Sequence, residues 1–376
     1  MEIESLYPLK PLREFVDTLG GLWTGKKAPL VRAKVLRNTN FTSSGTLSLD
    51  NVAEIEVETA ALAKRRLQAG DIILEKSGGS STQAVGRVVL FEERIQEEYA
   101  YSNFTVRLRV MTDILLPKYL HLYLHDFYLK GGTFGMQNGS SGLKNLNMES
   151  YLSVPIPLPP MEIQQAIVDE CAVVDAEYES SRTKIEDLKR KIDSLFASLS
   201  ASSVKRLKLS DKSVFSVAIG KRVVEQELEE DGTIPVYSAN VYTPVGLINK
   251  LLVEDFSSAS VLWGIDGDWM TNTLPAGYPF YPTDHCGVLR VVAGGIIKEK
   301  YLQYELDQAG KQFGFSRSLR ASIDRVGQLS VSVPPMSEQE RVIREIEGYE
   351  AEIRKAEAVM QGVEARKSAI LRKYLE

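Results

Sequence analysis

Two long stretches of the chain carry apolar residues at alternating intervals of three and four. The first register runs from Ile167 to Leu199 and is apolar except at Ser181. The same register, 175 residues later, contains Lys367 as its single charged position. Such spacing over four heptads is typical of a coiled-coil seam, so we expect two long helices. We assign the seam and partner-docking positions to Ile167, Val174, Ile185, Leu188, Ile192, Leu195, Val342, Ile346, Ile353, Met360, Val363 and Ile370.

Each helical stretch follows a matching segment, which reveals an internal repeat. VPIPLPPMEIQQAIVDE (154–170) aligns with LSVSVPPMSEQERVIRE (329–345) at a constant offset of 175 residues. Upstream, KYLHLYL (118–124) resembles KYLQYEL (300–306), in the same order along the chain. Ordered matches at a nearly constant offset indicate two similar halves.

The region before each long helix combines short β-like runs with one helical run. The predicted strands, rich in β-branched residues, are 30–36, 71–76, 86–91 and 104–110 in the first half and 260–265 and 287–292 in the second. The predicted short helices are 117–130 and 298–312. Both globular regions are therefore expected to be mixed α/β.

These patterns divide the chain into four segments. They are a globular domain at 1–158, a helix at 159–200, a second globular domain at 201–333 and a second helix at 334–376. If the seams pair, connectivity makes the helices antiparallel, with a length of roughly 60 Å at 1.5 Å per residue. We predict an α+β fold with two similar mixed α/β domains separated by two antiparallel coiled-coil helices, as a pseudo-two-fold repeat. The alternative is that each helix packs on its own domain as an ordinary core helix.

Composition narrows the class of protein. The chain has 376 residues, 44% of them hydrophobic and 25% charged, which suits two or three globular domains. It has no run of eighteen apolar residues and no signal-peptide pattern, so we expect no membrane span, no export and a cytoplasmic location. The two cysteines, Cys171 and Cys286, form no CxxC or Cys/His cluster, so we expect no structural metal site.

The net charge of −5 argues at first against a nucleic-acid partner. Much of the excess acid, however, lies in residues 159–200, which hold nine acidic and five basic residues. A nearly neutral domain can still bind nucleic acid if its basic residues gather on one face.

Polar loops beside the predicted strands carry the candidate binding residues. SGGSSTQ (77–83) is either a phosphate-binding loop or a plain flexible hairpin, and it lacks the lysine of a P-loop. GGTFGMQNGSSGLKN (131–145) and GKQFGFSRSLR (310–320) share a GxxFG frame but differ in polar residues. They are either one scaffold with two specificities or solvated connections. The candidate DNA-binding residues are Lys76, Ser77, Ser80, Gln137, Asn138, Lys144, Asn145, Lys311, Gln312, Arg317, Ser318 and Arg320.

Two further patterns are ambiguous. WGIDGDW (263–269) holds two acids and two tryptophans, which either contact bases or form a turn over a small core. His121 and His125 share a helix face, as metal ligands do, but no third ligand accompanies them. We expect them to be ordinary surface or packing histidines.

The order GDIILEKSGG, YSNFTVRLRV, KYLHLYL, GLKNLN and VPIPLPPMEIQQAIV, followed by a long helix, resembles the specificity subunits of type I restriction–modification systems. The second half repeats this frame and ends VPPMSEQERVI, so the resemblance covers essentially the whole chain. The second half departs from it where the GDI and Asn-Phe motifs become SVLWGIDGD and Asp284-His285-Cys286.

The resemblance implies a function for each segment. Each half would be a target-recognition domain that reads one half of a split double-stranded DNA site, while the helices set the gap. Two methyltransferase subunits would clasp the helices, and restriction (motor–nuclease) subunits would join for cleavage. On this basis a four-residue insertion after Ser200 should widen the gap by one or two base pairs.

Missing motifs agree with a non-catalytic chain. Both Pro-Pro pairs, in Leu158-Pro159-Pro160-Met161 and Val333-Pro334-Pro335-Met336, lack the polar residue and aromatic residue of a DNA amino-methyltransferase motif. We expect no catalytic residue and no cofactor here, with S-adenosylmethionine, Mg and ATP only on partner subunits. The competing hypotheses are a coiled-coil scaffold or adaptor that binds only proteins, and a fragment of a fused restriction enzyme.

Overall fold

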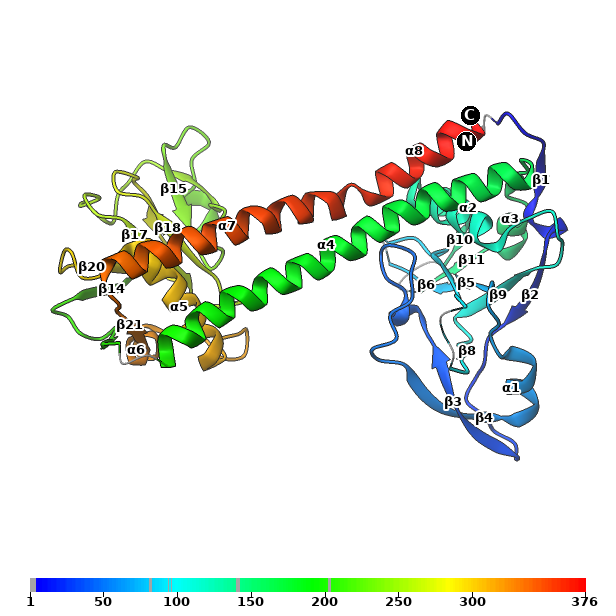
Figure 1. The fold of residues 1–376 in the computed structure, drawn as a ribbon, viewed down its shortest axis with the longest axis horizontal. Helices are drawn as coiled ribbons and strands as arrows, with labels where there is room; N and C mark the ends of the chain where they lie inside the picture. The colour runs from blue at the N-terminus through cyan, green and yellow to red at the C-terminus, as the bar shows by residue number, and fades with distance from the viewer. Residues whose placement is uncertain (1–4, 81–82, 94, 96, 140–142, 202–203) are drawn as a thin grey trace. The chain divides into compact units, whose positions relative to one another are not determined.

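The computed structural model describes residues 5–80, 83–93, 95, 97–139, 143–201 and 204–376. Parts of two candidate loops, residues 81–82 and 140–142, lie outside the described residues. The chain forms two compact units (Figure 1). Unit 1 comprises Met1–Ser181 and Ala358–Glu376, and unit 2 comprises Arg182–Glu357.

Unit 1 is built on a four-stranded antiparallel sheet in the order β2-β9-β5-β7. Its strands are β2 (Val16–Gly20), β9 (Thr105–Val110), β5 (Ile72–Glu75) and β7 (Val88–Leu90). A second sheet, β4-β3-β8, pairs β3 (Leu30–Leu36) with β4 (Ala53–Glu58) antiparallel and with β8 (Ala100–Tyr101) parallel. The smaller pairings join β1 (Leu9–Pro11) to β12 (Pro155–Pro157), and place β11 (Lys144–Leu146) between β10 (Gln137–Asn138) and β6 (Ser77–Gly78).

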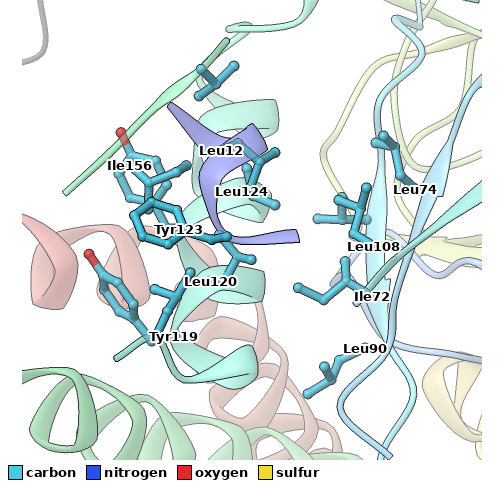
Figure 2. Packing of buried hydrophobic residues seen from close by; sticks show 14 of the residues in the cluster. Leu12, Ile72, Leu74, Leu90, Leu108, Tyr119, Leu120, Tyr123, Leu124 and Ile156 are labelled. Atoms are coloured by element: carbon cyan, nitrogen blue, oxygen red, sulfur yellow. The ribbon is translucent and has the colours of Figure 1, made fainter. Parts of the chain in front are cut away.

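The core of unit 1 lies between the four-stranded sheet and α2 (Pro117–Leu129). Tyr119, Leu120 and Leu124 of this helix are fully buried, and strand residues such as Ile72 and Leu108 lie across from them (Figure 2). Each such side chain contributes about 1.5–3 kcal/mol on burial, which fixes α2 on the sheet. The other short helices of this unit are α1 (Thr59–Arg65), α3 (Met148–Leu152), and the 3-10 turns Leu12–Glu14, Asn38–Asn40 and Phe134–Met136.

Among the described residues, unit 2 repeats the four-stranded sheet, the second sheet and the two-stranded pairing of unit 1, but not its small sheet β10-β11-β6. Its four-stranded sheet has the order β14-β20-β17-β18, and a second sheet has the order β16-β15-β19 with β15 and β19 parallel. The strands are β13 (Arg206–Lys208), β14 (Phe215–Ile219), β15 (Ile234–Tyr237), β16 (Gly246–Ile248), β17 (Ser260–Gly264), β18 (Thr271–Leu274), β19 (Tyr281–Pro282), β20 (Cys286–Val291) and β21 (Ser330–Ser332). The helices are α5 (Glu299–Phe313), α6 (Ile323–Gln328) and the 3-10 turn Glu225–Glu227.

A pair of glycines shows how closely the two frameworks agree. An added Cβ would lie 2.0 Å from the Ser102 carbonyl oxygen at Gly21, and 1.8 Å from the Pro282 carbonyl oxygen at Gly220. Each glycine follows the first strand of its four-stranded sheet, where the chain meets the parallel strand of the second sheet. Only glycine permits so close a backbone approach. The predicted repeat of two similar mixed α/β domains is confirmed.

The first long helix, α4 (Met161–Ala201), is unbroken over 41 residues (Figure 1). The predicted second helix is interrupted: α7 (Met336–Gln361) ends at Gly362, and α8 (Val363–Leu375) begins after it. Glycine at this position weakens the helix because it costs roughly 1 kcal/mol relative to alanine in a helix interior. The prediction of one continuous helix over 334–376 is therefore wrong at Gly362.

Within each unit the long helices run antiparallel. In unit 1, Glu170 of α4 pairs with Lys373 of α8 at 2.7 Å, and Glu177 pairs with Arg366 further along. In unit 2, Lys184 of α4 pairs with Glu352 of α7. The partner number falls as the α4 number rises, as antiparallel helices require.

The seam residues nearest the helix ends also join the domain cores. Ile167 lies in the core cluster of unit 1 together with Leu371 and Leu375 of α8. Val342 and Ile346 lie in the core cluster of unit 2. The start of each long helix therefore packs on the domain that precedes it, whereas the end of each packs on the core of the other domain. The alternative that each helix packs only on its own domain is wrong.

Candidate functional site

The small sheet β10-β11-β6 brings the candidate residues of unit 1 together. Asn145 lies opposite Asn138 on one side and opposite Ser77 on the other. Lys144 lies opposite Gly78. Segments separated by some sixty residues in the sequence thus form one polar surface at the end of β5.

Within this surface, the hydrogen bonds separate exposed residues from residues that hold the loops. Ser77 is buried, and its Oγ donates to Oδ1 of the exposed Asn145 at 2.6 Å. Both ends of the Gln137 carboxamide are occupied, by the Val85 amide and the Phe134 carbonyl, each at 3.1 Å. The Lys144 ammonium donates to the Gly139 carbonyl at 3.0 Å. Ser80 accepts from the Gln83 amide at 3.0 Å, which shapes its own loop.

Three side chains missed in the sequence support this surface from below. The buried Glu75 carboxylate accepts two hydrogen bonds of 2.8 Å from Arg87, which raise the pKa of the Arg87 guanidinium. Asn38 donates to the Ser77 carbonyl at 2.6 Å. The backbone of Ser77 and Gly78 is thereby fixed, which positions the pair formed by Ser77 and Asn145. Single-sequence reasoning had no signal for these contacts because they join segments far apart in the chain.

In unit 2, the acids of WGIDGDW meet the arginines of the loop after α5. Arg320 binds Asp266 through Nε and Nη2, and the latter distance is 2.9 Å. Arg317 binds Asp268 with distances of 3.2 and 3.1 Å. His285 also pairs with Asp266 through Nδ1. Both candidate arginines of this unit therefore pair with acids of this turn.

The tryptophans of the same turn belong to the core, in agreement with the prediction of a turn over a small core. Trp263 is fully buried and donates from Nε1 to the Ala321 carbonyl at 2.8 Å. Trp269 packs on Phe315, with ring centroids 5.0 Å apart. The remaining candidates lie nearby in sequence: Lys311 pairs with Asp307 at 2.6 Å, Ser318 bonds Ser316 at 3.1 Å, and Gln312 is exposed.

Backbone hydrogen bonds align the two surfaces residue by residue. The Leu146 amide donates to the Lys76 carbonyl at 2.8 Å in unit 1, and the Ala321 amide donates to the Ile265 carbonyl at 3.0 Å in unit 2. The residues beside these bonds, Asn145 with Ser77 and Arg320 with Asp266, therefore occupy equivalent positions. We call Ser77–Asn145 and Asp266–Arg320 the junction pairs.

An exposed ring flanks each junction pair. The Lys76 amide donates to the Phe104 carbonyl at 2.9 Å, and the Ile265 amide donates to the His285 carbonyl at 3.0 Å. Phe104 and His285 are thus equivalent too. Phe104 is 40% exposed, which is high for a phenylalanine. The same framework presents Ser, Asn and Phe in one unit and Asp, Arg and His in the other.

A buried glutamine anchors the start of each long helix. Gln164 accepts from the Leu116 amide at 2.8 Å and donates to the carbonyls of Ile114 and Pro159, each at 2.9 Å. Gln339 makes the equivalent three bonds in unit 2, to Lys298, Ile296 and Pro334. The sequence repeat matched these two glutamines, but it gave no indication of their role.

The two histidines of α2 are packing residues and not surface residues. Their rings stack with centroids 6.0 Å apart, and His125 lies 3.2 Å from Glu364 of α8. Burial lowers the pKa of His121 to about 3. Among the residues that the structure describes, no three His, Cys, Asp or Glu side chains are grouped as metal ligands would be.

The predicted seam positions fall into two groups. Those that are buried are Ile167, Val174, Ile185, Leu188, Val342, Ile346 and Val363. Those that are half-buried are Ile192, Leu195, Ile353, Met360 and Ile370. Lys367, the charged seam residue, is also buried and forms an ion pair with Asp175. In the described part of the chain, no helix combines the length and apolarity needed to cross a bilayer.

Comparison with known proteins gives matches in both halves. Residues 18–190 and 204–359 match the sequence family described as the type I restriction modification DNA specificity domain. The chain is 29% identical over 126 residues to a Mycoplasma pneumoniae protein named as a type I specificity subunit, covering 33% of this chain and 41% of that protein. It is 21% identical over 180 residues to the Escherichia coli type I restriction enzyme EcoKI specificity subunit, covering 48% and 37%. The chain thus spans about two-fifths of the length of these relatives.

Two solved structures share the fold over the whole chain. One is the S subunit of a type I restriction-modification system from M. genitalium, with a TM-score of 0.55, 14% identity and coverage of 100% of this chain and 98% of that chain. The other comes from work on complex assembly and conformational transition of the type I R-M system, with a TM-score of 0.61, 15% identity and 99% coverage of both chains.

Proposed function

Because the chain belongs to the type I restriction–modification DNA specificity family, we propose that it is the DNA-recognition subunit of such an enzyme. The domain of each unit reads one half of a bipartite double-stranded DNA target, in the cytoplasm. The long helices fix the gap between the half-sites and dock the methyltransferase subunits. Restriction subunits join this assembly for cleavage.

The observation that carries the proposal is the pair of equivalent surfaces. One framework, repeated in both units, presents Ser77–Asn145 in the first and Asp266–Arg320 in the second. Phosphate contacts position a protein on DNA, whereas side chains at base edges specify sequence. A protein that reads two different half-sites needs this combination of a constant framework and variable polar residues.

The charge of the chain supports a shared DNA interface. At −5 overall, the chain lacks the excess of positive charge that supplies phosphate affinity in many DNA-binding proteins. Partner subunits would then contribute phosphate contacts, and this chain would contribute the choice of sequence. We propose two methyltransferase subunits, one for each half of the repeat.

The proposed role predicts that the purified chain alone has no nuclease, methyltransferase or ATPase activity. The acids nearest the junction of unit 2, Asp266 and Asp268, are paired with arginines, which leaves them poorly suited to hold a catalytic metal. Turnover by the pure chain that is lost on changing a single carboxylate would contradict this prediction. The assays should be repeated with the methyltransferase and restriction subunits added, as positive controls.

The function is tested by expressing the chain with its methyltransferase subunit in a host without adenine methylation. Long-read sequencing of the host DNA should then show methylation at one split motif with two half-sites. Omitting the chain should abolish that motif while the methyltransferase is still produced. If methylation is the same with and without the chain, or follows no motif, a protein scaffold becomes the better description.

A further inference from the structure

The junction pairs occupy one position in the repeated framework but offer different chemistry. We infer that they determine specificity, with Asn145 reading an adenine in one half-site and Arg320 reading a guanine in the other. This inference rests on the proposed function and adds the class of base that each unit recognises.

Arg320 retains the donors that guanine requires. A guanidinium has five N–H donors, and Asp266 occupies the Nε donor and one donor of Nη2. The three remaining donors include one on each terminal nitrogen, a spacing that suits N7 and O6 of guanine. The side chain is 59% exposed, and Asp266 is 29% exposed. The ion pair holds the guanidinium plane before DNA arrives, which reduces the entropy lost on binding.

Asn145 has the matching arrangement for adenine. Its Oδ1 has two lone pairs, of which the Ser77 hydroxyl occupies one. The second lone pair and the Nδ2 amide suit the N6 donor and N7 acceptor of adenine. Because Ser77 is buried and its carbonyl is held by Asn38, the orientation of the Asn145 carboxamide is fixed from below.

The flanking rings support the inference that each junction pair faces outward, towards a ligand. The Phe104 carbonyl accepts from the Lys76 and Ser77 amides, and the residue is 40% exposed. An exposed apolar ring suits contact with a thymine methyl group or a base face. His285, in the equivalent place, pairs with Asp266 through Nδ1, and its side chain is 47% exposed. Each junction therefore combines a hydrogen-bonding pair with an accessible ring.

Arg317 provides a matched control in the same loop. It also pairs with an aspartate, Asp268, but both side chains are more exposed, at 79% and 66%, and the distances are longer. It does not occupy the junction position. A guanidinium so placed suits a phosphate, whose contacts carry little sequence information.

The test measures binding of the chain, assembled with its methyltransferase subunit, to DNA libraries randomised at one half-site at a time. Arg320→Ala should reduce the preference for one guanine in one half-site by about 5- to 150-fold, with other bases of that half-site unaffected. Asn145→Ala should do the same for one adenine in the other half-site. Arg317→Ala should weaken binding to all sequences evenly and lower its dependence on salt.

A double substitution tests whether the junction pair can transfer a base preference from one unit to the other. Ser77→Asp with Asn145→Arg places the junction pair of unit 2 in unit 1. The adenine preference should change to guanine at that base, while the half-site read by unit 2 stays unchanged and reports that the assembly is intact.

Three outcomes separate this inference from the proposed function. If the unaltered assembly reads a split target but the single variants keep every base preference, the inference is wrong and the function stands. If a variant loses its whole half-site instead of one base, the junction pair is structural and the inference is also wrong. If the unaltered assembly has no sequence preference, the proposed function itself fails.

Discussion

At the scale of single residues, the two buried glutamines show how the framework is held. Gln164 satisfies the amide of Leu116, the residue before α2, and two carbonyls with one side chain, and it is completely buried. Buried backbone groups that lose their partners cost about 1–3 kcal/mol each. The backbone at this proline-rich helix start therefore depends on a single carboxamide for its hydrogen bonds.

We expect Gln164→Ala to destabilise unit 1 by about 2 to 4 kcal/mol, because it leaves buried backbone groups without partners. Chemical denaturation would measure the loss, and hydrogen exchange should place it at the start of α2. Gln165→Ala is the matched control, since the neighbouring Gln165 is exposed and bonds only Asp169. Equal effects of the two substitutions would contradict the assigned role.

His121 predicts a pH dependence of stability. Its pKa is lowered by burial to about 3, whereas an unfolded histidine titrates near 6.5. Above pH 6.5 the ring is neutral in both states. Below it, the unfolded chain takes up a proton that the folded chain does not, so stability falls as the pH drops from 6.5 towards 3.

Replacing His121 by glutamine, the residue at the equivalent position 303 of unit 2, should remove this part of the pH dependence. The measurement is the urea denaturation of unit 1 within the full chain at pH 7.5 and pH 5. The loss of stability between the two pH values is compared for the variant and the original chain. Identical losses of stability in both proteins would show that another group is responsible.

At the scale of elements, the sequence predicted the long helices, α2, α5 and the strands β3, β5, β7, β9, β17 and β20, but not the other strands of the described residues. The strand at 30–36 and the helices near 117–130 and 298–312 match β3, α2 and α5 to within about a residue. The strands β10, β11 and β6 were missed because two or three residues are too few to show a period.

The break at Gly362 was also missed, because the heptad pattern runs through it without interruption. Gly362 has φ −82° and ψ −7°, a conformation open to any residue. An added Cβ would lie 3.7 Å from its nearest neighbours, the carbonyl oxygens of Ala358 and Val359. Space and backbone therefore both allow a larger residue.

Gly362→Ala should accordingly stabilise the chain by about 0.5–1 kcal/mol, since alanine loses less entropy on forming a helix. Gly310→Ala is the contrasting variant: its Cβ would lie 2.2 Å from the Trp269 ring, so it should destabilise unit 2. Thermal unfolding of both variants checks the direction of each change in stability. A loss of stability in Gly362→Ala would mean that the interruption itself is needed.

At the scale of the whole molecule, the candidate site was predictable as a set of residue types but not as an arrangement. The loops named from the sequence contain Ser77, Asn145 and Arg320, yet nothing local indicated that Ser77 meets Asn145 or that Asp266 meets Arg320. These pairs join segments whose contact depends on the tertiary fold. Once the fold is known, the repeat itself identifies the equivalent positions.

The structure also indicates a different insertion point for lengthening the helices. Phe196 and Leu199, near the end of α4, are buried in the core of unit 2. Four residues added after Ser200 would therefore extend the connection to β13 and leave the helix contacts unchanged. We therefore do not expect that insertion to widen the gap between the half-sites.

Paired insertions at the boundaries between the units avoid this difficulty. The boundary lies between Ser181 and Arg182 in α4 and between Glu357 and Ala358 in α7. Seven residues added at both places keep the heptad phase and preserve the ion pairs on either side, Glu177–Arg366 and Lys184–Glu352. The helices gain about 10 Å, which corresponds to about three base pairs.

Under the proposed function, the doubly lengthened chain should direct methylation to the same two half-sites with a gap about three base pairs wider. Methylome sequencing gives the gap directly. Insertion into α4 alone is the control and should abolish methylation, because the two helices then lose their matching register. Methylation at the original gap by the doubly lengthened chain would show that the helices do not set the spacing, since both would be longer while the distance between the half-sites had not changed.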